Sequence, residues 1–275
     1  MNEKRVISQI NFRLKDLTMG LSTLFKTRHY IVIIPTLAIL CACGTTKEER
    51  MQAKPTEELI ATAKENLGSN QFKTAIEYYD LVEARLPQGA ISEESKLAKI
   101  YAYYRDRDPE KALAEANAFL RSFPNHPQAS YAWYMKGMVD FDRALSVVDK
   151  ILPPDRSKID PAQMKRSLES FETVVTRFPK SDYAEDSLQR ATYLKNMLAK
   201  AEINVAEFYM RRKAYLAVIN RAQTVLDHYD RTPEVANALY LQVKAYRLLQ
   251  LDDLASDRLR IFQQNFPEDP RLATL

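Results

Sequence analysis

The strongest constraint on this chain is a helix-terminating motif that recurs along most of its length. An aromatic residue or leucine precedes a proline at Leu86-Pro87, Phe123-Pro124, Phe178-Pro179 and Phe266-Pro267, and Tyr229-Asp230 is a version without proline. Twelve residues before each of these Pro or Asp positions stands a small or β-branched residue: Ala75, Ala112, Ser167, Val218 and Ala255. Proline cannot continue a helix, and a small residue at a fixed distance marks a close helix crossing. The motif therefore predicts repeated pairs of packed helices.

A tetratricopeptide repeat, which is two antiparallel helices in about 34 residues, accounts for this spacing. When Pro87 is placed at the closing position, Leu59, Ala63 and Tyr79 fall where the repeat requires bulky, small and aromatic side chains. Only 5 glycines among 275 residues leave little material for the turns of an all-β fold. We predict an all-α fold, an α-solenoid of about five tetratricopeptide-like helical hairpins, with repeats 1–2 in residues 55–126 and repeats 3–5 in residues 127–275.

Two irregularities interrupt the period. Trp133 to Gly137 matches the large-then-small opening of a first helix, but the proline that closes the third repeat comes 18 residues late, at Pro179. The intervening text contains Pro153-Pro154, so we predict an inserted loop over residues 146–163. Apolar residues three or four apart from Ser181 to about Arg211 then predict one helix of about 45 Å, which would project from the solenoid or bridge its halves.

The N-terminal segment has the pattern of an export signal. Lys26 and Arg28 precede a short apolar run, which ends in Leu40-Cys41-Ala42-Cys43. Ten apolar residues are too few to span a bilayer, which takes roughly 20. We predict a signal peptide over residues 1–42, with Met19 as a possible true start, and a flexible tether over residues 43–54. A plain signal peptide or an uncleaved anchor is the alternative.

The Leu-x-Ala-Cys ending resembles a bacterial lipobox, which implies that Cys43 carries a diacylglycerol and an N-acyl chain. Gly44, rather than an aspartate, follows it. This implies outer-membrane delivery, in the inner leaflet and facing the periplasm.

Charge and histidine content limit the other classes of function. Six basic and two acidic residues lie in residues 1–42, so the remainder of the chain has 34 of each sign. A neutral body removes the electrostatic argument for nucleic-acid binding, and we expect no nucleic-acid partner. Three scattered histidines, no cysteine after Cys43 and no glycine-rich phosphate loop indicate no metal, no cofactor and no enzyme.

Several segments resemble the BamD family of outer-membrane assembly lipoproteins. They are Ile100 to Tyr104, Tyr134 to Gly137, Asp155 to Ser157 followed by Asp160-Pro161, Val205 to Tyr209, and Ala217 to Arg221. The segments follow the family order over about residues 55–262 and include the irregular loop. The resemblance implies a non-catalytic scaffold of the β-barrel assembly (BAM) complex. Its N-terminal repeats would receive unfolded outer-membrane β-barrel proteins, and its C-terminal repeats would dock BamA beside other BAM lipoproteins.

The same resemblance suggests individual site residues. Tyr78, Tyr101 and Tyr104 would line the substrate groove, and Arg221 would contact BamA. Tyrosines spaced along a helix more often belong to the hydrophobic core between repeats than to a binding site. Arg221 can equally be interpreted as a solvated arginine that pairs with a nearby acid. Relatives carry Arg-Tyr-Pro where this chain has Arg85-Leu86-Pro87, which puts a contact through that tyrosine hydroxyl in doubt.

Two other functions fit parts of the sequence. An exported cell-wall hydrolase would share the leader, but neighbouring acids such as Glu93-Glu94 point to different sides of a helix. A repeat lipoprotein that recruits peptidoglycan-remodelling enzymes, or one that serves competence for DNA uptake, would share the solenoid. Recovery of BamA with the purified protein is the observation that separates these partners.

Overall fold

A computed structural model describes residues 47–144 and 161–275. It divides into two compact units, residues 1–55 and 56–275, which are considered separately. The predicted signal peptide, Cys43 and most of the predicted loop lie outside the described residues. The first unit contains α3 (Lys47–Gln52). This short helix lies within the predicted tether over residues 43–54, which was not expected to contain a helix. Glu48 and Glu49 in the first turn favour a helix N-terminus.

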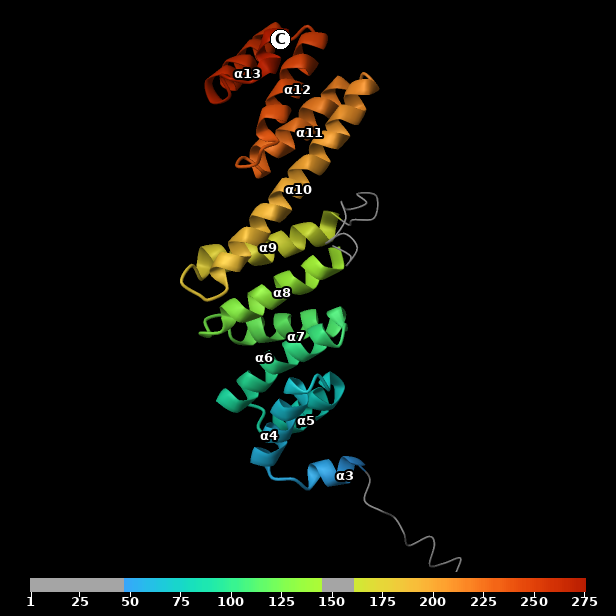
Figure 1. Cartoon of the computed structure of the whole chain (residues 1–275), viewed down its shortest axis with the longest axis vertical. Coiled ribbons are helices and arrows are strands. Elements are labelled where there is room, and N and C mark those ends of the chain that lie inside the picture. The colour runs from blue at the N-terminus through green and yellow to red at the C-terminus, as the bar shows by residue number, and fades with distance from the viewer. Residues whose placement is uncertain (1–46, 145–160) are drawn as a thin grey trace, which may run out of the picture. The chain divides into compact units, whose positions relative to one another are not determined.

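The second unit consists of five helical hairpins, as the repeat spacing predicted. Their helices are α4 (Thr56–Gly68) and α5 (Phe72–Arg85), α6 (Ala90–Arg105) and α7 (Pro109–Ser122), α8 (Ala129–Ala144) and α9 (Pro161–Arg177), α10 (Ala184–Arg211) and α11 (Tyr215–His228), and α12 (Val235–Leu248) and α13 (Asp252–Asn265), followed by the 3₁₀ helix η1 (Pro270–Thr274). Each helix packs on the next along the chain, and α6 also contacts α8 as α10 contacts α12 (Figure 1). The described residues thus form an all-α solenoid.

Hairpin packing confirms the small-residue positions predicted from the sequence. Ala75, Ala112, Ser167 and Val218 are fully buried, and Ala255 is 3% exposed. The residue four positions before each helix-ending Leu, Phe or Tyr is also fully buried, and these five are Val82, Phe119, Val174, Val225 and Phe262. The repeating motif therefore marks both the end of the second helix and the core position one turn earlier.

The turns inside four hairpins share one backbone conformation. Asn70, Arg107, Lys213 and Gln250 have φ between 59° and 61°. This left-handed region is unfavourable for residues with a Cβ, and asparagine tolerates it better than arginine or lysine does. Lys213 adopts this conformation in the turn between α10 and α11 although lysine carries a Cβ.

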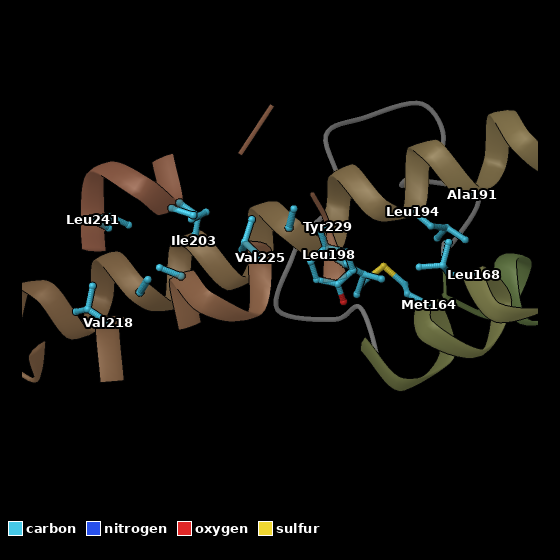
Figure 2. Close-up of a cluster of buried hydrophobic side chains, with 14 of the residues drawn as sticks. Met164, Leu168, Ala191, Leu194, Leu198, Ile203, Val218, Val225, Tyr229 and Leu241 are labelled. Atoms are coloured by element: carbon cyan, nitrogen blue, oxygen red, sulfur yellow. The ribbon is translucent and has the colours of Figure 1, made fainter. Parts of the chain in front are cut away.

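The long helix α10 joins the third, fourth and fifth hairpins. Its 28 residues correspond to about 42 Å, and it starts three residues later than predicted. It packs on α9, α11 and α12, so it bridges the repeats. Leu194 and Leu198 share a buried cluster with Met164 and Leu168 of α9, and Ile203 lies in the same cluster with Val218 of α11 (Figure 2).

The predicted loop 146–163 differs from the structure at its C-terminal end. Residues 161–163 belong to α9, because Pro161 takes the first helical position, where its missing N–H costs nothing. The remaining residues of the predicted loop, 146–160, lie outside the described part of the chain. Among the described residues, no helix combines the length and the apolar content needed to cross a bilayer.

Candidate functional site

A pocket of about 480 Å³ opens on the first helices of hairpins 1 to 4. Its lining comes from α4, α6, α8 and the segment that leads into α10. Three tyrosines from three successive hairpins contribute to the wall: Tyr101, Tyr131 and Tyr183. The remaining lining includes Leu67, Leu97, Pro127, Ser130, Ser181, Glu94, Lys180 and Asp182. The volume lies within the range that holds ligands in other proteins.

Aromatic contacts set the positions of the pocket tyrosines. The ring of Tyr183 lies 5.5 Å from that of Tyr131 and 5.0 Å from that of Tyr134, and the second pair is stacked. Burial, followed by the neighbouring Tyr183 and Tyr101 hydroxyls, raises the pKa of Tyr131. The phenol is therefore neutral at physiological pH. It offers a ring face together with a hydroxyl that both donates and accepts hydrogen bonds.

Tyr101 is held by Arg105, one turn later on the same helix, and Arg105 in turn contacts the first hairpin. Its hydroxyl accepts a hydrogen bond from Arg105, and Arg105 also donates to Asn70 Oδ1 at 3.1 Å. The same guanidinium lies over the ring of Phe72, 5.1 Å from its centroid. Arg105 thus links the wall of the pocket to the left-handed turn of the first hairpin.

Beside the pocket, a polar network connects α6, α8 and α10. Tyr104 donates to Asp142 at 2.6 Å, and Tyr134 donates to Asp186 at 2.8 Å. Burial and the bond to Asp186 raise the pKa of Tyr134 to about 12. Burial acts to raise the pKa of Asp186, but the bonds from Arg190 and Tyr134 together lower it. Tyr134 therefore joins this network to the stacked ring of Tyr183.

Ser181 presents a polar atom that has no internal partner. Its Oγ is buried, and within the described residues it has no hydrogen-bond partner, although the residue lines the pocket. An unpaired buried hydroxyl is unfavourable unless a bound group or water satisfies it. Together with the exposed Lys180 and Asp182, it gives this end of the pocket groups suited to peptide N–H, C=O or charged partners.

The residues suggested from the resemblance do not all meet here. Tyr101 lines the pocket, whereas Tyr104 lies beside it in the polar network. Tyr78 is 9% exposed on α5 and is not part of the lining. Arg221 lies on α11 and pairs with Glu202 of α10 at 3.0 Å, with its side chain 46% exposed. The contact between Arg221 and BamA stays a prediction, as does the attachment of lipid to Cys43.

Sequence reasoning missed Tyr131, Tyr183 and Lys180. A tyrosine at or just before the start of successive first helices was the available signal, since Tyr131 follows Ala129 at the start of α8 and Tyr183 precedes α10. Among the described residues, no group of His, Cys, Asp or Glu has an arrangement that could hold a metal ion. The site therefore consists of aromatic rings, hydroxyls and a few exposed charges.

Comparisons with known proteins find relatives that match most of the chain. The chain is 36% identical over 238 residues to the outer membrane protein assembly factor BamD of Neisseria meningitidis serogroup B, covering 85% of this chain and 89% of that protein. It is 31% identical over 240 residues to the BamD of Pasteurella multocida, covering 87% and 92%. It is 33% identical over 229 residues to the BamD of Vibrio cholerae, covering 83% and 95%.

A family model described as "Outer membrane lipoprotein" matches residues 52–261. This range includes all of hairpins 1 to 4 and nearly all of the fifth. The chain belongs to the YfiO family of outer membrane lipoproteins.

Proposed function

We propose that this protein is a non-catalytic scaffold of the BAM complex, which assembles β-barrel proteins into the outer membrane. Relatives that match over more than four fifths of the chain are named assembly factors of outer membrane proteins. A solenoid of stacked hairpins presents an extended binding surface, and the candidate site offers rings and hydroxyls rather than reactive groups.

The pocket of three tyrosines is the observation that carries the proposal for client binding. An unfolded outer-membrane protein presents extended segments in which aromatic and polar residues alternate. Aromatic side chains of such a segment fit between Tyr101, Tyr131 and Tyr183, which favour offset or edge-on ring contacts. The hydroxyls, Ser181 and Lys180 then remain for the polar backbone and for charged groups.

The C-terminal hairpins are proposed to dock BamA, with Arg221 in the contact. The Arg221–Glu202 pair fixes the guanidinium while leaving nearly half of the side chain accessible. Cys43 is proposed to carry the lipid that holds the chain on the inner leaflet of the outer membrane, facing the periplasm. More than one acyl chain is needed for stable anchoring, and a lipid-modified N-terminal cysteine supplies them.

A peptide-binding measurement tests the client pocket. The ligand is a fluorescent peptide that reproduces the last strand of an outer-membrane β-barrel protein, and fluorescence anisotropy gives its Kd. Tyr183→Ala removes a ring that touches both Tyr131 and Tyr134, and we expect about tenfold weaker binding, about 1.4 kcal/mol. Tyr193→Ala is the matched control, because Tyr193 is a tyrosine 42% exposed on α10 that is not in the lining.

Two further measurements complete the test. Thermal unfolding of both variants shows whether a loss of binding follows from a loss of fold. Depletion of the protein in cells should lower the amount of folded outer-membrane barrels, and affinity purification should recover BamA. Unchanged barrel levels, or equal peptide affinity in the Tyr183 and Tyr193 variants, would overturn the corresponding part of the proposal.

A further inference from the structure

Exposed apolar side chains concentrate on one edge of the fourth and fifth hairpins. Nine large hydrophobic residues are exposed in the described part of the chain, and six of them lie between residues 205 and 254. They are Val205 at 37%, Phe208 at 43%, Leu216 at 66%, Leu248 at 52%, Leu251 at 41% and Leu254 at 46%. Single exposed leucines are ordinary, but a cluster of this kind usually marks an interaction site.

The order of the helices brings these residues to the same edge. Phe208 and Leu216 flank the turn between α10 and α11, and Leu248 and Leu251 flank the turn between α12 and α13. Because α12 packs on both α10 and α11 and the helices alternate in direction, the two turns lie at neighbouring corners. Met210, Tyr215 and Leu249, which lie at these turns, all pack against the same buried cluster.

The first of these corners is strongly basic. Arg211, Arg212 and Lys213 are consecutive and exposed, and within the described residues none of them has an ion pair. By contrast, Arg221 forms an ion pair with Glu202, and Arg271 forms one with Asp269. The guanidinium of Arg212 lies over the Phe208 ring, 4.5 Å from its centroid. The exposed acids nearby are Glu207 on the same helix and Asp252 and Asp253 at the next corner.

We propose that this basic corner, defined by Phe208, Arg211, Arg212, Lys213 and Leu216, rests on an anionic phospholipid bilayer. Arginine and lysine attract the negative headgroups, while phenylalanine and leucine enter the boundary between headgroups and acyl chains. Leu248, Leu251 and Leu254 extend the apolar area beside it. Membership in a family of outer membrane lipoproteins places such a surface close to the chain.

The shape of the corner favours a bilayer over a second protein. The apolar side chains stand at two helix turns, so they project at tips, whereas protein hot spots are anchors that fill pockets. The described pocket is lined by residues of hairpins 1 to 4 and by none of these tips. A deformable bilayer accepts projecting rings and leucines without a matching cavity. The unpaired charges of residues 211–213 fit its net negative surface.

Tryptophan fluorescence tests the contact in the whole protein. The chain contains 1 tryptophan, so Trp133→Phe removes the background. Leu216→Trp then reports on the corner, and Leu188→Trp is the matched control at an exposed leucine, 54% accessible, near the other end of α10. Each variant is purified from membranes and reconstituted into vesicles of phosphatidylcholine alone or with one third phosphatidylglycerol.

In the anionic vesicles we expect a blue-shifted emission and quenching by brominated acyl chains for the Leu216→Trp reporter only. Arg211→Gln, Arg212→Gln and Lys213→Asn should together reduce the ratio of contacting to non-contacting protein by roughly a hundredfold, since each cation contributes about fivefold to that equilibrium. High salt should act in the same direction. Asparagine is chosen at position 213 because it tolerates the left-handed turn.

Three outcomes would overturn the inference. The reporter at position 216 could remain in water on both kinds of vesicle, or it could shift equally on neutral vesicles, or it could be shielded only when the protein is assembled with its protein partners. The last result would make the edge a protein contact. None of these outcomes bears on peptide binding to the tyrosine pocket, so failure here leaves the proposed client site standing.

Discussion

Replacing Gly137 by alanine measures how closely α8 and α9 pack in the third hairpin. A Cβ at this position would lie 2.7, 2.8 and 2.9 Å from three ring carbons of Phe171. The Phe171 ring is fully buried and is packed by Tyr134 and Phe141, so it has little freedom to move aside. In addition, Ser167 of α9 donates to the Gly137 carbonyl of α8 at 2.8 Å, which holds the two helices together at this point.

The expected loss follows from two opposing effects. Overpacking of a filled core costs about 1–3 kcal/mol, while alanine in place of a helical glycine contributes about 1 kcal/mol. The net destabilisation should be about 1 kcal/mol, or about 2–4 °C in Tm for a unit of this size. Circular dichroism at 222 nm during heating measures it.

Gly68→Ala is the matched control. Gly68 is the last residue of α4, and a Cβ there would meet nothing within 4 Å. Its Tm should stay the same or rise. In the Gly137→Ala background, Phe171→Leu should cost less than it does alone, because the smaller side chain relieves the clash. If Gly137→Ala raises the Tm as much as Gly68→Ala does, the close packing of α8 on Phe171 is refuted.

Three other substitutions test interactions elsewhere in the solenoid. Lys99 is 5% exposed and pairs with Asp80, Glu83 and Glu115, so Lys99→Met should cost about 3 kcal/mol in urea unfolding by removing the cation that these three carboxylates share. Burial lowers the pKa of Lys99, but the hydrogen bonds to Asp80 and Glu115 outweigh it and raise the pKa. This stabilisation should be complete below about pH 10.4, the unfolded value, and should be lost as pH rises further, which parallel titrations of wild type and Lys99→Met would detect. Asp108 caps α7 by accepting from the Lys111 N–H at 3.2 Å, so Asp108→Ala should lower stability by about 1 kcal/mol, and an unchanged urea midpoint would contradict the cap. Arg271 donates to Asn237 and Asp269 and covers the rings of Tyr240 and Phe262, so Arg271→Ala should speed amide hydrogen exchange in α12 and α13 but not in α4 and α5.

The repeat could be predicted because it depends on local chemistry that recurs. A helix end followed by proline, or by aspartate in the fourth repeat, recurs in all five repeats together with a small or β-branched residue at the crossing, and both can be recognised from spacing alone. The α3 helix was missed because its six residues have no apolar period, and only the acidic first turn indicated a helix. The predicted loop extended to residue 163, whereas α9 begins at Pro161, because proline is well suited to the first helical turn.

The pocket was less predictable because its members come from three hairpins of unequal length. Tyr131 follows Tyr101 by 30 residues, but Tyr183 follows Tyr131 by 52, since the long insertion lies between them. A fixed period therefore does not align the three. The hydrogen bond from Tyr134 to Asp186, which lies 52 residues away in the sequence, could not be predicted from a fixed period for the same reason. The network beside the pocket required the helices to be placed in space.

The α10 helix connects the two proposed surfaces. Tyr183 at its N-terminal end lines the tyrosine pocket, and Phe208 and Arg212 at its C-terminal end belong to the basic corner. Between them Ala191, Leu194, Leu198, Ile203 and Ala206 are buried along its length, and the helix packs on α9, α11 and α12. The pocket and the corner are consequently held about 40 Å apart. If the corner rests on a bilayer, a segment bound at the tyrosines is kept at a set position relative to that bilayer, and the two binding events need not compete.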